Sequence, residues 1–248
     1  MRRILLLLLF VPTLLRAQVG EYRTDLAVGA SAGYTLSRVG FIPEVPQTML
    51  GGMTAGVTLR YTCEKYFKSI CALQLELNMS QAGWKEDIRD IDGAPVVYSD
   101  NGEALAYQRK VTYLQIPMLA RMGWGRERRG VQAYIVLGPQ IGFKLSEQTT
   151  SNIDNSRATV TSRSSSITAQ YGMPVERTFD YGITGGAGIE LSLRRLGHFQ
   201  VEARYYYGLG DIYKNSKSDY FGRSNIGQVV IKASYLFDLI RTNNDKIK

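Results

Sequence analysis

The chain has 248 residues, of which 44% are hydrophobic and 21% are charged, and its formal net charge is +8 at pH 7. Residues 1–17 combine Arg2 and Arg3 with an apolar run at Ile4–Leu15 and a cleavage point after Ala17, which is the pattern of a secretory signal peptide. Removal of this leader takes away three arginines and lowers the charge to +5, too small a surplus to indicate a nucleic-acid partner. No later apolar run approaches the roughly 18 residues of a transmembrane helix. We therefore expect one domain over residues 18–248.

After the leader, apolar and polar residues alternate in eight segments, which is the period of a β-strand with one apolar face. In chain order, we expect strands at Leu26–Leu36, Met49–Tyr61, Ile70–Gly83, Val111–Met122, Val131–Leu145, in the two arms of Phe179–Leu209, and at Ile226–Phe237. Each arm is about as long as a membrane-crossing β-strand, roughly ten residues. Pro117 and Pro139 lie inside strands, and we expect a bulge at each because a closed barrel has no edge.

The clearest pair of strands lies within Phe179–Leu209, where two alternating segments flank a turn at 194–197. One face is apolar and rich in aromatic residues, whereas the other carries full charges in mid-strand, such as Glu202 and Arg204. A soluble β-sandwich is the alternative, but it would bury these charges or leave the apolar face in water. We interpret the apolar face as lipid-facing and the polar face as lumen-facing.

The predicted connections alternate in length along the chain. The long ones are 37–48, 84–110, 146–178 and 210–225, and the short ones are 62–69, 123–130 and 194–197. Outer-membrane barrels have short periplasmic turns and longer extracellular loops. We therefore predict an all-β fold, an eight-stranded antiparallel up-and-down transmembrane β-barrel in a Gram-negative outer membrane. Both termini would be periplasmic, and the Ser/Thr-rich loop 146–178 would be mobile.

Aromatic residues gather near the strand ends, as girdles at the two membrane interfaces require. The expected girdle residues are Tyr34, Tyr61, Trp124, Phe143, Tyr181, Phe199, Tyr205, Tyr207, Tyr235 and Phe237, with Trp84 added at the outer level.

Charged residues on the opposite parity define a predicted lumen network. Its members are Arg60, Glu76, Arg121, Glu190, Glu202, Arg204 and Lys232. Eight strands leave an interior that side chains just fill. Because an unpaired buried charge costs roughly several kcal/mol, we expect these residues to pair, to plug the lumen and to have a structural role rather than a catalytic one.

The remaining reactive residues indicate little chemistry. Cys63 and Cys71 flank the turn between the second and third strands and could face each other, so the alternatives are a disulfide and two free thiols. The only histidine, His198, lies at a short turn, where we expect an interfacial polar residue. One histidine and two cysteines cannot form a structural zinc site unaided. We predict no catalytic, cofactor-binding or metal residue.

Four segments together resemble a known family. They are YLQIPMLARMGW (Tyr113–Trp124), YIVLGPQIGF (Tyr134–Phe143), DYGITGGAGIEL (Asp180–Leu191) and ARYYYGLGDI (Ala203–Ile212). In this order they resemble the outer-membrane β-barrel family of Bacteroidetes called PorT-like or "porin family protein". The resemblance implies a small outer-membrane barrel, and the namesake of the family is implicated in type IX protein secretion. The family supplies no catalytic residue.

Three functions remain open at this stage. The first is a non-enzymatic barrel that contacts outer-membrane lipid and lipopolysaccharide and binds an envelope or secretion-system protein, or supports envelope assembly, without a cofactor. The second is a porin for small solutes, which would need an empty lumen or a wider barrel. The third is an outer-leaflet enzyme, which would need a polar constellation at the outer rim. We favour the first, because the inward charges of both signs predict a filled lumen.

Overall fold

The computed structural model describes residues 21–66, 68–127, 129–193, 196–216 and 219–241, so the predicted signal peptide lies outside the described residues. The strands are β1 (Glu21–Ile42), β2 (Gln47–Thr48), β3 (Leu50–Tyr66), β4 (Ser69–Glu86), β5 (Tyr107–Gly125), β6 (Gly130–Ser151), β7 (Phe179–Leu193), β8 (Gly197–Asp211) and β9 (Arg223–Ile240). One short 3₁₀ helix, η1, spans Ala169–Tyr171. Within these ranges, no helix has the length and apolarity that a membrane span requires.

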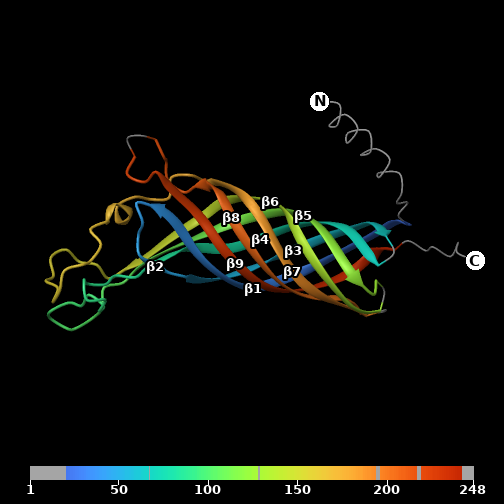
Figure 1. Ribbon diagram of the computed structural model, residues 1–248, viewed down its shortest axis with the longest axis horizontal. Coiled ribbons are helices and arrows are strands. Elements are labelled where there is room, and N and C mark those ends of the chain that lie inside the picture. The colour runs from blue at the N-terminus through green and yellow to red at the C-terminus, as the bar shows by residue number, and fades with distance from the viewer. Residues whose placement is uncertain (1–20, 67, 128, 194–195, 217–218, 242–248) are drawn as a thin grey trace, which may run out of the picture.

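Eight long antiparallel strands close into a ring (Figure 1). Each long strand pairs with its neighbours in the chain, and the β1–β9 pairing closes the ring. The short strand β2 adds to the edge of β4. The long connections lie at one end of the barrel, here the long-loop end, and the short turns lie at the other, the short-turn end. The predicted eight-stranded up-and-down barrel is confirmed.

Side chains alternate between the two faces of the wall as the sequence pattern predicts. In β8, Val201 and Tyr205 are exposed on the outside, whereas Glu202 and Arg204 are buried inside. The register places Glu202 opposite Gly188 of β7 and Lys232 of β9. The outward apolar surface therefore surrounds an interior of polar and charged side chains.

At the long-loop end, the strands are longer than predicted. The outward face is polar there and the inward face is mostly apolar, so these residues do not show the pattern of a membrane strand. β1 continues to Ile42, and β5 begins at Tyr107, four residues before its predicted start. Outward positions such as Arg38 and Lys110 are polar in this extension. Most of the buried inward positions are apolar, with Ser37 and Arg109 as buried polar exceptions; the apolar ones are Val39, Phe41, Ala82, Trp84, Tyr107, Val111 and Tyr113. This part of the wall follows the pattern of a water-soluble β-protein, and we assigned it to loops because we read only the membrane pattern.

An aromatic cluster forms the core of this extension. Phe41 packs edge-on against Trp84 with ring centroids 5.2 Å apart, and it contacts Phe221 at 4.9 Å. Phe221 also stacks on Tyr213 at 5.5 Å. Trp84, which we expected in the outer girdle, is fully buried here, because even-numbered positions of β4 face inward. The expectation for Trp84 was wrong.

The ten remaining girdle residues all project outward. Their exposed fractions run from 38% at Tyr207 to 51% at Tyr34. Phe199 and Tyr235 pack together near the short-turn end, with ring centroids 4.8 Å apart.

The two strand prolines do not produce the expected bulges. The β5–β6 offset is the same on both sides of Pro117, and the β6–β7 offset is the same on both sides of Pro139. The β4–β5 ladder is instead interrupted opposite Pro117, between the pairs Leu75↔Met118 and Asn78↔Gln115. A missing N–H therefore interrupts a ladder without shifting the register.

Candidate functional site

Four charged side chains meet in the middle of the barrel and form the central layer. Glu76 of β4 binds Arg204 of β8 at 2.7 Å and Lys232 of β9 at 2.6 Å. Glu202 binds the same two cations, at 2.6 Å and 3.1 Å. Two carboxylates and two cations thus form a closed cycle with no net charge. Each of the four side chains is at most 6% exposed.

Neutral side chains complete the coordination of this layer. Gln74 and Asn78 donate hydrogen bonds to Glu76 at 2.6 Å and 2.8 Å. Tyr134 donates to Glu202 at 3.1 Å. Ionised carboxylates only accept hydrogen bonds, and buried ones are stable when several donors surround them.

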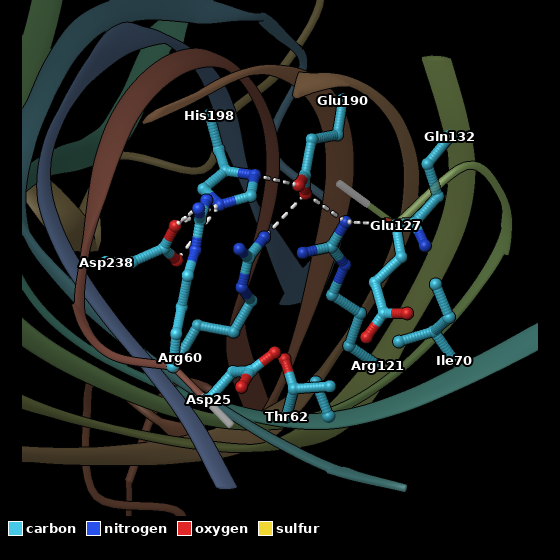
Figure 2. Close-up of a pocket in the computed structure, with 12 residues that line it drawn as sticks. Asp25, Arg60, Thr62, Ile70, Arg121, Glu127, Gln132, Glu190, His198 and Asp238 are labelled. Carbon is cyan, nitrogen blue, oxygen red and sulfur yellow. Dashed lines mark hydrogen bonds and ion pairs between the residues drawn. The ribbon is translucent and has the colours of Figure 1, made fainter. Parts of the chain in front are cut away.

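A second charged layer lies nearer the short-turn end, where β7 ends and β8 begins. Figure 2 shows its side chains. Its centre is Glu190 of β7, whose Oε2 accepts hydrogen bonds from Arg60 of β3 and Arg121 of β5. Gln200 donates to the same oxygen at 2.8 Å. Arg121 also lies 3.8 Å from the centre of the Tyr134 ring, which borders the central layer. The seven predicted lumen residues are thus brought together in two layers.

His198 also belongs to the second layer, and this position was not predicted from the sequence. Its Nδ1 lies 2.7 Å from Glu190 Oε1 and its Nε2 lies 3.0 Å from Asp238 Oδ1 (Figure 2). We expected His198 at the membrane interface, but it is buried, and that expectation was wrong. The parity of β8 carried the missing signal, because His198 shares the inward face of Gln200 and Glu202.

Ser192, His198 and Asp238 form a hydrogen-bonded chain of the residue types used in nucleophilic catalysis. Ser192 Oγ lies 2.9 Å from His198 Nδ1. However, Nδ1 also faces Glu190 and Nε2 faces Asp238, so each ring nitrogen lies against a carboxylate rather than toward a substrate position. The adjoining cavity has a volume of about 30 Å³, which holds water but no ester substrate. This geometry suits the holding of charge rather than attack on a substrate.

At the long-loop end, two connecting segments fold against each other. Residues 87–106 and 152–178, here called the cap, are joined by backbone hydrogen bonds such as Val160 N to Val97 O at 2.9 Å. Arg157 binds Asp100 through two hydrogen bonds of 2.9 Å and 2.6 Å, and its guanidinium lies 3.8 Å from the centre of the Tyr98 ring. We expected residues 146–178 to form a mobile loop, whereas residues 146–151 belong to β6 and residues 152–178 pack on the first segment.

The cap is anchored to the barrel through the end of β4. Glu86 accepts hydrogen bonds from Gln170 at 2.7 Å and from Tyr171 at 2.5 Å. Glu86 lies beyond Met79, the last of the outward apolar residues of β4. Burial raises the pKa of the Glu86 carboxyl and that of the Tyr171 hydroxyl.

Comparison with known proteins identifies the family of this barrel. Residues 16–214 match the model of a family described as outer membrane protein beta-barrel domain. The chain belongs to this outer-membrane β-barrel family. Its location is accordingly the outer membrane. No curated protein sequence matches it significantly.

Two solved structures of outer-membrane proteins are similar to this β-barrel. One is Ail, the attachment invasion locus protein of Yersinia pestis, in complex with the heparin analogue sucrose octasulfate. It has 16% identity and a TM-score of 0.35, and the match covers 86% of this chain and 99% of that chain. The other is OprG of Pseudomonas aeruginosa, with 12% identity and a TM-score of 0.45, covering 88% and 98%.

The two cysteines of the barrel are free thiols in this structure, in contrast to the disulfide alternative. An irregularity between Thr62 and Glu64 shifts the β3–β4 register at the turn. Glu64, rather than Cys63, is therefore the partner of Cys71. Because of this irregularity, Cys63 and Cys71 do not face each other across the hairpin.

Metal ligands are not gathered anywhere in the described part of the barrel. No group of three or more His, Cys, Asp or Glu side chains there has the arrangement of a metal site.

Proposed function

We propose that this outer-membrane barrel is non-enzymatic and closed to solutes, and that it presents its cap outside the cell for binding. The main observation in support of this proposal is that buried ion pairs cross the lumen. β4 and β8 lie four strands apart in a ring of eight, so the pair between Glu76 and Arg204 spans the interior. The pair between Arg60 of β3 and Glu190 of β7 spans it a second time.

The porin and enzyme alternatives fit these observations less well. A porin needs a hydrated passage, whereas the aromatic cluster at Phe41 and Trp84 adds a third barrier beyond the two charged layers. An outer-leaflet enzyme needs its polar constellation at the outer rim, whereas His198 lies at the short-turn end.

The orientation follows from the loop lengths. Short turns of outer-membrane barrels are periplasmic, so the cap would be extracellular and both ends of the chain periplasmic. Lipid and lipopolysaccharide would surround the apolar outer face. The resemblance to PorT-like proteins favours an envelope or secretion-system protein as the partner, and a role in envelope assembly.

A capture experiment tests this function. The purified protein would be compared with a variant in which residues 87–106 and 152–178 are replaced by short Gly-Ser linkers, after cross-linking in intact cells. We expect an envelope or secretion-system component with the wild type alone, because the cap supplies the binding surface. Equal capture by the variant would place the binding surface elsewhere, and no such component with either protein would count against the proposal.

A further inference from the structure

The cap contains a pocket that none of the interactions above explains. Its volume is about 520 Å³, within the range of small-molecule sites. It lies between the two segments of the cap, and Tyr98, Leu105 and Ile153 form part of its wall. A pocket of this size on the water-exposed side of a membrane protein suits a small polar ligand.

Two arginines line the pocket, and they differ in how their charge is used. Arg157 is engaged by Asp100 and lies against the Tyr98 ring. Arg163 donates one hydrogen bond, from Nη1 to Tyr171 Oη at 2.8 Å, and its guanidinium lies 5.4 Å from the centre of that ring. Over the described parts of the chain, Arg163 forms no ion pair within 4.0 Å. A guanidinium has five N–H donors, so Arg163 has donors left for an anion.

The rest of the lining provides hydroxyl groups and a small apolar patch. Thr159, Ser165, Ser166 and Thr168 supply hydroxyls, which donate and accept hydrogen bonds as sugar hydroxyls do. Leu105 and Ile153 provide apolar contact of the kind that a C–H face of a sugar ring makes. Asp154 is the one carboxylate in the lining, and Asp100, outside the lining, pairs with Arg157. Arg163 is therefore the lining cation that has no ion pair within 4.0 Å in the described residues.

The pocket is held in shape before any ligand arrives. Ser164 binds the Arg89 carbonyl twice, through its backbone N–H at 2.8 Å and its Oγ at 2.9 Å. Tyr98 Oη donates to Asn152 O at 2.8 Å and accepts from the backbone N–H of Asp154 at 2.6 Å. A preorganised pocket loses less conformational entropy on binding than a mobile loop.

We propose that this pocket binds a saccharide that carries one anionic group, a carboxylate or a phosphate. The anionic group pairs with Arg163, and the hydroxyl side chains bind the sugar hydroxyls. Such a sugar has two sources, the lipopolysaccharide of the same membrane and a free acidic polysaccharide. The inference rests on the proposed function only in that the cap faces outward.

Isothermal titration of the full chain in detergent tests the pocket, with glucuronic acid, glucose 6-phosphate and glucose as probes. We expect binding of the two anionic sugars, and affinity about tenfold or more weaker in Arg163→Gln, as for the loss of a charge-assisted hydrogen bond. Ser166→Tyr should weaken binding by filling the pocket. Arg177→Gln, which changes an exposed arginine outside the lining, should bind as the wild type does. Limited proteolysis of each variant would establish that the cap is intact.

Three results would overturn the proposal: no binding of either anionic sugar, glucose bound as well as its phosphate, or an unchanged affinity in Arg163→Gln. A second titration distinguishes the sources. Arg163-dependent binding of purified lipopolysaccharide assigns the site to the membrane's own sugars. Arg163-dependent binding of soluble polyuronate alone assigns it to a free polysaccharide. A barrel that conducts ions would refute the closed lumen without touching this result.

Discussion

Glu76 and Arg204, on opposite walls of the barrel, form a buried bidentate ion pair with hydrogen bonds of 2.7 Å and 2.9 Å. Lys232 binds the same carboxylate and also reaches Glu202, so each acid of the central layer shares both cations. A layer of this kind ties strands together across the lumen, and it fixes their register because one slipped residue would move every charge to the lipid face.

Removal of one acid from the central layer should destabilise the barrel. In Glu202→Ala, Arg204 and Lys232 share Glu76 alone, and one buried positive charge is left uncompensated. We expect a loss of about 3 kcal/mol, within the range for breaking a buried pair. Urea unfolding in lipid vesicles would measure it, with Glu44→Ala as the exposed control. An unchanged unfolding midpoint in Glu202→Ala would show that the layer contributes nothing to stability.

Two neighbouring glycines of β7 should respond differently to alanine. A Cβ at Gly186, on the inner face, would lie 2.3 Å from the carbonyl oxygen of Ala203, a fixed backbone atom. A Cβ at Gly185, on the outer face, would lie 3.3 Å from the flexible end of Leu137 and 3.8 Å, an ordinary contact distance, from the carbonyl oxygen of Val136. We expect Gly186→Ala to lower the folded fraction on heat-modifiability gels and Gly185→Ala to fold normally. Equal folding of the two variants would contradict this packing.

The anchor of the cap should weaken as pH rises. Burial raises the pKa of Glu86, so the folded cap binds this proton more tightly than the unfolded cap does. Stability then falls as pH rises from the ordinary glutamate pKa, about 4.3, through the raised value. Limited proteolysis of the cap across this window should show decreasing protection in the wild type and a flatter profile in Glu86→Gln. Identical profiles would mean that Glu86 does not control the anchor.

Cys63 and Cys71 should both react with a maleimide in protein purified without reductant, because the structure has them as free thiols. Mass spectrometry should find two labels on each intact chain. An unlabelled chain that accepts two labels only after reduction would restore the disulfide alternative.

The strand count and the orientation of side chains in the apolar belt could be predicted from the sequence because one physical rule governs them. Where lipid lies outside, outward residues such as Val201 and Tyr205 are apolar, and the period of two reveals the wall. The same rule fails at Val39 and Tyr107, where water lies on the outside and the two faces exchange polarity.

The tertiary contacts of the candidate sites were harder to predict from the sequence. The alternation of side chains along the strands predicted that Glu190 and Arg60 face the lumen. Their pairing, however, depends on which strands lie opposite each other in the closed ring. His198 was misplaced because it borders a turn, where parity seemed a weaker guide than position. The cap was missed because its order comes from contacts between distant segments, such as Arg157 with Asp100, which leave no periodic signal.

Planar-bilayer recording of the purified full chain tests the closed lumen most directly. We predict no single-channel steps from the wild type, and none from the variant with Gly-Ser linkers in place of the cap, because the seal lies in the charged layers of the lumen. Stable and reproducible single-channel steps from the wild type would contradict this account and favour the porin alternative.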